Sequence, residues 1–306
     1  MIDDTSDSGL EFQREMVQFQ YQKYMAFFFF IYIGSYLAPV IALMFYLFLI
    51  LKPLFLEVNN IITIFTSLDS LFIFLTIPLV VVLFYLSHLF FLAVFTRISW
   101  KYTERKSPTK DGIIPRDIRS KTADYYHYRS FMIKYGKNAF MKGIFPWLAN
   151  WFYNFVGACA IDKGTTFEES VLNDRNIEVG RNCYIGVNSI LASHVVEGVF
   201  GNIVCFKVKV KDNVTLGGFN VIGPGGELEE NSYLLPLSLA TKFNKTQGNN
   251  YYFGIPLRRI FNKKIMEYLK VSEVDLNRAE ELRIRQVNAK ANSSNKEEIN
   301  NKEKLN

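Results

Sequence analysis

The side chains best suited to acid–base chemistry are scarce in this chain, which has three histidines: His88, His127 and His194. Imidazole titrates close to neutral pH, so histidine is the usual general base for taking a proton from a hydroxyl or amine. His194 lies in the stretch N-S-I-L-A-S-H-V-V-E-G, with Glu197 three residues further on. A carboxylate there can accept the second ring N–H and fix the tautomer. His194 and Glu197 are therefore the candidate catalytic pair.

A six-residue repeat lies on both sides of this pair. Apolar residues recur at every sixth position from Ile161 to Leu191 and from Val210 to Leu234, with Asn173 as the polar exception. Glycine follows the repeated residue at Gly180, Gly186, Gly217 and Gly223. Such a period is the signature of a β-solenoid, in which each hexad supplies a short strand and a corner. A β-sandwich is the alternative, because strand alternation has period two, but it does not explain the spaced glycines.

An interruption of the repeat falls next to His194. Leu191 and Val210 are nineteen residues apart, one more than a coil of three hexads, so the repeat is broken between them. His194 then stands where a regular coil gives way to an irregular excursion, and functional residues concentrate on loops held by a scaffold. A histidine that only packs or faces solvent is the alternative. We expect no metal, since a three-histidine zinc site does not fit a solenoid with one histidine.

Two long apolar segments predict a membrane hairpin. Met25 to Leu51 carries no charge, Ser70 to Thr96 contains only His88 as an ionisable group, and each exceeds the ~20 residues needed to cross a bilayer. Eight basic residues lie between Arg97 and Lys121, whereas the loop between the segments holds one lysine. The positive-inside rule places both termini and the solenoid in the cytoplasm. We interpret His88 as structural; a polar pathway through the membrane is the alternative.

The composition divides the chain into five regions. We expect a cytosolic N-terminal segment (1–24), a two-helix transmembrane hairpin (25–98), a juxtamembrane helical region (99–157), the hexapeptide-repeat β-helix (158–260), and a short helix with a disordered tail (261–306). In the juxtamembrane region Trp147, Trp151 and Phe155 fall on one helical face. That face suits the membrane interface or a cap on the first coil.

Charge and cysteine content narrow the partners. The net charge of +6 is mild, and no basic stripe or nucleic-acid motif accompanies it, so we expect the bilayer rather than a nucleic acid as partner. The three cysteines show no ligand spacing. They predict reduced, partly buried thiols instead of disulfides or zinc.

Several of these motifs together resemble the hexapeptide-repeat acyltransferase superfamily. They are the hexads, the S-H at the end of a run, and the closing Y-F-G-I-P-L-R-R, in which Gly254, Pro256 and Arg258 match a Gly-X-Pro-Ala-Arg-like ending. Leu257 stands where that ending has a small residue. With this resemblance, the predicted fold class is a membrane α-helical hairpin plus an all-β solenoid, a left-handed parallel β-helix of about five coils.

The membrane-bound C-terminal region of poly-lysine-synthetase-type non-ribosomal peptide synthetases is a closer resemblance. Its solenoids carry a Gln-Thr-His-X-X-His/Glu motif, similar to Ala192-Ser193-His194 followed by Glu197. The stretch W-F-Y-N-F-V-G-A-C-A-I-D-K-G is also similar to its entry into the first coil. The resemblance covers about residues 135–260, and the chain has no adenylation or carrier domain.

The resemblance implies an activity. Superfamily members use an acyl donor such as acetyl-CoA, often form homotrimers, and use a histidine base, which we carry to His194. Lys242 and Arg258 are the candidate ligands of a CoA phosphate. The expected function is a membrane-anchored acyltransferase, acetyl- or acyl-CoA dependent. It acts on a hydroxyl or amine of a small-molecule, glycan or peptide acceptor at the cytosolic membrane face. A non-catalytic membrane-tethered scaffold or recognition module is the alternative; Val195 and Val196 beside His194 favour it. A transporter is third, since two spans form a pathway only by oligomerisation.

Overall fold

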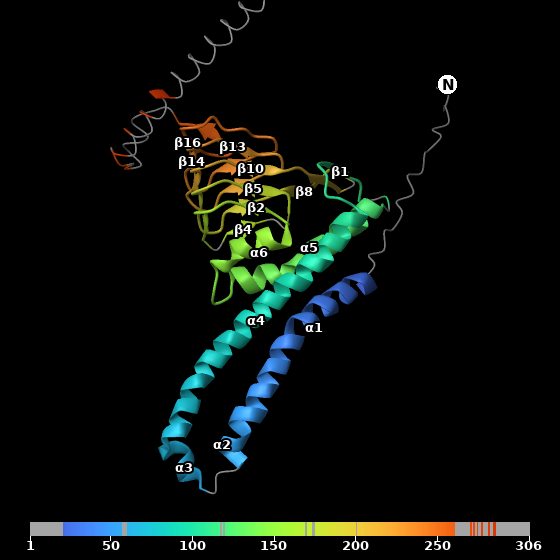
Figure 1. Cartoon of the computed structure of the whole chain (residues 1–306). Helices are drawn as coiled ribbons and strands as arrows, with labels where there is room; N and C mark the ends of the chain where they lie inside the picture. The colour runs from blue at the N-terminus through green and yellow to red at the C-terminus, as the bar shows by residue number, and fades with distance from the viewer. Residues whose placement is uncertain are drawn as a thin grey trace, which may run out of the picture. The chain divides into compact units, whose positions relative to one another are not determined.

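A computed structural model describes residues 21–56, 60–116, 118, 120–168, 170–172, 175–199 and 201–260, with seven positions between 270 and 285 (Figure 1). The predicted tail, residues 261–269 of the predicted C-terminal helix, and most of the predicted N-terminal segment lie outside these residues. The chain divides into two compact units. One comprises Met1–Ala158 and Val195–Cys205, and the other comprises Cys159–His194 and Phe206–Asn306.

The first unit is mainly helical. Its helices are α1 (Tyr21–Tyr46), which continues through a π-helical turn (Leu47–Leu51) into α2 (Lys52–Leu56), then α3 (Ile61–Thr66), α4 (Leu68–Lys106), α5 (Lys121–Met141) and α6 (Leu148–Val156). The loop predicted between the two spans is therefore partly helical. Helix α4 runs ten residues past its predicted end at Thr96. The hydroxyl of Ser67 caps α4 by accepting a hydrogen bond from the Ser70 N–H at 3.2 Å.

Two helices of this unit are long and apolar enough to cross a membrane. They are Tyr21–Leu51 and Leu68–Lys106, with mean hydropathies of 2.1 and 2.4. Only 11% and 6% of their most apolar windows are buried, whereas a core helix of a soluble protein is mostly buried. Their exposed side chains are largely Phe, Leu, Ile and Val. An apolar surface of this kind favours contact with lipid or with another protein. The orientation of the hairpin stays a prediction.

His88 lies in a polar contact between three helices. Its ring stacks on Tyr36 of α1, with 3.9 Å between ring centroids. Its Nδ1 is 3.4 Å from the Ser35 carbonyl oxygen, and its Nε2 is 3.2 Å from the Tyr135 hydroxyl of α5. Buried polar groups normally find such partners, so these contacts support the structural interpretation of His88.

The aromatic face of α6 packs within the helical unit. Trp151 and Phe155 stack at 5.0 Å between centroids. Arg97 of α4 lies 4.5 Å from the Phe155 ring centroid and donates a hydrogen bond to the Phe155 carbonyl at 2.5 Å. Trp147 stays exposed. This face therefore contacts α4, a partner that the sequence did not indicate. Close packing continues on α5, where a Cβ on Gly136 would lie 2.3 Å from the Phe152 ring.

The second unit is a three-sided solenoid of short parallel strands (Figure 1). The first face contains β2 (Ala160–Ile161), β5 (Ile177–Val179), β10 (Val208–Val210) and β13 (Glu227–Leu228). The second contains β3 (Thr166–Phe167), β6 (Tyr184–Ile185), β11 (Thr215–Leu216), β14 (Tyr233–Leu234) and β16 (Tyr251–Phe253). The third contains β4 (Val171–Leu172), β7 (Ile190–Leu191), β12 (Val221–Ile222) and β15 (Leu239–Ala240).

These parallel pairings confirm the solenoid and exclude the sandwich. Four coils of the described chain have strands on all three faces, and β16 adds a fifth strand to one face only. The predicted count of about five coils is therefore not confirmed, and the left hand stays what the resemblance implies. Strand β17 (Arg258–Arg259) closes the second face by pairing antiparallel with β16.

The core consists of columns of aligned aliphatic side chains. On the second face Ile185, Leu216 and Leu234 are in register and fully buried. On the third face the six-residue count pointed to Asn173, which lies outside the described residues. Leu172 takes that place instead, since it pairs with Leu191 and is 1% exposed. The prediction for position 173 is therefore wrong by one residue.

Asparagine forms one corner of the solenoid in four successive coils. Asn182, Asn213, Asn231 and Asn249 all have positive φ, between 55° and 57°. They stack on each other, because the residues two positions further on are strand partners. Asparagine tolerates this left-handed conformation better than other side chains. Glycine is needed at position 186 for a different reason. A Cβ there would lie 2.5 Å from the Leu216 carbonyl oxygen of the next coil.

Candidate active site at the break in the solenoid

The break in the solenoid is longer than the hexads indicate. Val210 pairs with Leu228, eighteen residues further on, but on its other side it pairs with Val179, thirty-one residues earlier. One coil therefore holds thirteen extra residues. The count of one extra residue is wrong because it continued the rhythm from Leu191, whose true partner is Ile222. The matching triplets I-E-V at 177–179 and V-K-V at 208–210 were the signal for the correct alignment.

Hydrogen bonds close the two ends of this excursion into a neck. The Phe206 N–H donates to the Ser193 carbonyl at 2.9 Å, so the chain leaves and re-enters the coil at adjacent points. The Ser193 hydroxyl is buried and donates to the Arg175 carbonyl at 2.6 Å. The Phe206 ring packs edge-on against Phe243, with 4.8 Å between centroids. The neck is thus held by the regular coils on both sides.

His194 is the first residue beyond the neck. It opens strand β8 (His194–Glu197) and is half-buried. The preceding residue, Ser193, is held by the scaffold, and the His194 side chain is partly exposed. The structure thereby places His194 at the base of the excursion, which agrees with its predicted place at the end of a regular coil.

The excursion itself is regular, where the sequence predicted an irregular segment. Strands β8 and β9 (Asn202–Cys205) are neighbours in one sheet, and β9 also pairs antiparallel with β1 (Gly112–Ile114). The register joins Ile114 to Ile203. Ile203 is buried, whereas Val199 is 85% exposed. Strand β1 was not predicted, because its three residues are too few to show a period.

Glu197 is the last residue of β8 and is half-buried. Side chains three apart in a strand project from opposite faces, so β8 by itself does not direct Glu197 towards the His194 ring. The helical or turn geometry that would favour an i, i+3 pair is absent from this strand. The role of Glu197 as tautomer-fixing partner stays a prediction.

The two candidate CoA ligands lie near the C-terminal end of the solenoid. Lys242 follows β15 and is exposed, and Arg258 is exposed on β17. Leu257, which departs from the small residue of the superfamily ending, is buried, and its N–H donates to the Leu239 carbonyl at 2.9 Å. It therefore packs the last coil. The structure describes no contact that joins Lys242 to Arg258, and their role stays a prediction.

Charged residues form a ladder on the first face. Glu227 lies 2.8 Å from the Lys245 ammonium and 3.2 Å from that of Lys209. Glu229 lies 2.9 Å from Lys211. The hydrogen bond from Lys245 lowers the pKa of Glu227, and that from Lys211 lowers the pKa of Glu229. These carboxylates are neutralised in pairs and are poor candidates for acid–base catalysis.

The cysteines are also poor candidates for catalysis. All three, Cys159, Cys183 and Cys205, are buried. Burial raises the pKa of the Cys183 thiol, whose sulfur donates to the Lys211 carbonyl at 3.0 Å. The thiolate is the nucleophilic form, so a raised pKa disfavours it. Among the described residues, no three His, Cys, Asp or Glu side chains group to hold a metal ion.

The known proteins that this chain resembles are solved structures. No family model and no curated protein matches the chain. It is similar to a hexapeptide-repeat acetyltransferase from Vibrio cholerae, with 18% identity, a TM-score of 0.33, and coverage of 35% of this chain and 64% of that one. It is also similar to AntD, an N-acyltransferase from Bacillus cereus solved with coenzyme A. The identity is 18%, the TM-score is 0.29, and the alignment covers 37% of this chain and 72% of that one.

A third similar structure is the polysialic acid O-acetyltransferase OatWY, with 15% identity, a TM-score of 0.29, and coverage of 33% of this chain and 52% of that one. These neighbours are acyltransferases by name. At such TM-scores, however, the likeness carries no argument about the site, and the chain spans less than two thirds of the first and third neighbours.

Proposed function

We propose that this protein is a membrane-anchored acyltransferase that uses acetyl- or acyl-CoA and His194 as general base. The observation that carries the proposal is the position of His194. It is the one histidine of the solenoid sequence, and it is the first residue beyond a hydrogen-bonded neck. The resemblance of the hexads and of the closing Gly254–Arg258 segment to the hexapeptide-repeat superfamily supplies the reaction class.

In the proposed reaction the His194 ring takes a proton from the acceptor hydroxyl or amine. The acceptor oxygen or nitrogen attacks the thioester carbonyl, and the carbon–sulfur bond breaks as the acyl group is transferred. The released CoA thiolate recovers the proton from the imidazolium. Glu197 would stabilise that imidazolium if its carboxylate reaches the second ring nitrogen. Transfer is direct, because the buried cysteines are poorly suited to an acyl-enzyme intermediate.

The donor and the assembly follow from the resemblance. Lys242 and Arg258 are exposed cations at the C-terminal end of the solenoid, as a ligand of CoA phosphates requires. A homotrimer is the assembly that the superfamily often forms. We place both termini and the solenoid in the cytoplasm, where acyl-CoA is made, with the acceptor at the cytosolic membrane face.

Histidine replacement tests this proposal. Full-length protein in detergent is assayed for CoA release with acetyl-CoA and a panel of hydroxyl and amine acceptors. His194→Ala should lower the rate by about 10²–10⁴-fold, the usual contribution of a general base. His127→Ala on α5 is the matched control and should leave the rate unchanged. Equal turnover by wild type and His194→Ala on every acceptor that reacts would remove His194 as the base.

A non-catalytic scaffold is the second candidate, and the β8–β9 hairpin favours it. Val195, Val196 and Val199 are exposed there, and exposed aliphatic side chains on a hairpin suit protein recognition. A scaffold predicts no thermal shift with CoA and a stable partner that is lost in Val196→Asp with Val199→Asp. An acyltransferase predicts a CoA-dependent shift that these two substitutions leave intact.

A further inference from the structure

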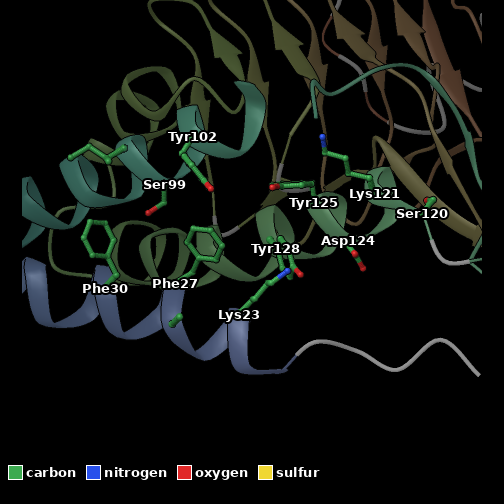
Figure 2. Close-up of a pocket in the computed structure, with 12 residues that line it drawn as sticks. Lys23, Phe27, Phe30, Ser99, Tyr102, Ser120, Lys121, Asp124, Tyr125 and Tyr128 are labelled. Atoms are coloured by element: carbon green, nitrogen blue, oxygen red, sulfur yellow. The ribbon is translucent and has the colours of Figure 1, made fainter. Parts of the chain in front are cut away.

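The helical unit contains a pocket that the proposed reaction does not use. Its volume is about 940 Å³, and it lies among the start of α1, the end of α4 and the start of α5 (Figure 2). Small-molecule sites in proteins occupy roughly 300–1,000 Å³, so the pocket has room for a large ligand. All of its lining residues belong to the first unit.

The lining changes from charged to apolar along α1. Lys23 lies in the first turn of that helix, and Phe27 and Phe30 follow on the same side (Figure 2). At 1.5 Å per residue, Lys23 and Phe30 are separated by roughly 10 Å along the helix axis. Ile98 of α4 adds to the apolar part. A ligand with a polar head and a hydrocarbon chain matches this gradient.

Ser99 supplies an independent sign of a ligand. Its side chain lines the pocket, is 3% exposed, and has no hydrogen-bond partner for its hydroxyl among the described residues. The neighbouring hydroxyls of α4 are different, since Thr96 donates to the Leu92 carbonyl at 2.7 Å and Thr103 to the Trp100 carbonyl at 2.8 Å. Buried hydroxyls are almost always satisfied, so the unpartnered Ser99 hydroxyl is an unusual polar group in the wall of this pocket. Its oxygen is itself covered, so a polar ligand atom reaches it when the Ser99 side chain rotates towards the pocket.

The charges at the polar end favour an anion. The charged lining residues are Lys23, Lys121 and Asp124, which leaves one excess positive charge. The remaining titratable lining groups are the phenols of Tyr102, Tyr125 and Tyr128. The Lys23 ammonium lies 6.0 Å from the Tyr128 ring centroid, which holds it beside the pocket. Lysine is a common phosphate ligand, and phenol hydroxyls can add hydrogen bonds.

We propose that this pocket binds a membrane lipid with an anionic phosphate headgroup. The headgroup lies between Lys23 and Lys121, the chain packs against Phe27, Phe30 and Ile98, and the ester region meets the Ser99 hydroxyl. A lipid is favoured over a free phosphate because most of the exposed lining is apolar. The proposal does not depend on the acyltransferase activity.

Native mass spectrometry of the delipidated full-length protein tests the site. It is titrated with phosphatidylglycerol and phosphatidylcholine of identical chains, which differ in headgroup charge. Wild type should retain one phosphatidylglycerol with about tenfold preference, because the excess positive charge of the lining repels the choline cation that only phosphatidylcholine carries. Lys23→Gln with Lys121→Gln should bring the preference close to parity. Both lysines are exposed, so the fold should be kept. Ala26→Phe, which fills the apolar part, should weaken binding of both lipids.

A second pair of lysines provides the control. Lys52→Gln with Lys134→Gln removes the same charge from exposed positions on α2 and α5 that do not line the pocket. This control should keep the tenfold preference. Equal retention of both lipids by wild type, or equal loss in the two lysine pairs, would overturn the proposal. Displacement of the lipid by glycerol phosphate alone would assign the site to a free phosphate instead.

Discussion

The solenoid and the helical unit bury their side chains in different ways. In the solenoid each coil repeats the contacts of the previous one, as in the column of Ile185, Leu216 and Leu234. In the helical unit each contact is particular, such as the Phe152 ring that fits against Gly136 and stacks on Phe140 at 4.6 Å. In the solenoid the two adjacent coils share the loss of packing that a substitution causes. In the helical unit that loss falls on one contact between two helices.

The largest effect should come from the helical unit. Phe152→Ala should lower the free energy of unfolding by about 3–5 kcal/mol, because a fully buried ring leaves a cavity between α5 and α6. Thermal denaturation in detergent, followed by circular dichroism, measures this. Trp147→Ala, at an exposed position beside the same helix, is the control and should change little. A decrease in the free energy of unfolding below about 1 kcal/mol would mean that the helices repack around the missing ring.

A central column residue of the solenoid should come next. Leu216→Ala should cost about 2–5 kcal/mol, since Leu216 is fully buried with a coil on each side. Thr215→Ala removes the side chain that points outward from the same strand and should cost far less. Limited proteolysis of the two variants measures the difference in their stability. Equal stability of the two variants would show that the core column does not hold the coils together.

A corner residue should have a smaller effect. Asn231→Ala should cost about 1–2 kcal/mol, because alanine resists the left-handed conformation and loses the 2.8 Å hydrogen bond from Asn231 to Asn249. Asn231→Gly restores the conformational freedom but not the hydrogen bond, so it should recover the backbone part of the loss when both variants are melted under the same conditions. An equally stable alanine variant would mean that the corner relaxes to another turn.

The smallest effect should be the acid response of the charged ladder. Glu227 and Glu229 have lowered pKa values in the folded chain, so their ion pairs stabilise it above the usual carboxyl pKa of 4.5. This contribution is lost as the pH falls below 4.5 and through the folded pKa values. Surface pairs contribute little, so the melting temperature should fall only slightly more than in Glu227→Gln with Glu229→Gln. An identical acid response in that variant would remove the ladder as a source of stability.

The difference between repeated and non-repeated contacts also explains which features were predictable from the sequence. The columns of the solenoid repeat, so their period is visible, and a three-sided parallel fold follows from it. The error at the break arises because the rhythm gives spacing within a run but no alignment across an insertion. The contacts of His88 with Tyr135, and of β9 with β1, involve segments far apart in the chain that share no period. Only the folded arrangement reveals them.

Of the candidate site, the position of His194 at the end of a regular coil was predictable, because the repeat stops there. The order of the following residues into strands was not, since V-V-E-G is too short to show alternation. That strand conformation bears directly on Glu197, whose odd spacing from His194 suits a turn better than a strand.

The hydrogen-bonded neck has a consequence for how this chain can change over time. The Phe206 N–H donates a hydrogen bond to the Ser193 carbonyl at 2.9 Å, so the segment between these two residues is an insert whose ends meet. Its length and sequence can vary without shifting the register of any coil, and loops of this kind tolerate insertions well. The coils are then a fixed frame, and the β8–β9 hairpin is an exchangeable part through which related chains can acquire new binding surfaces.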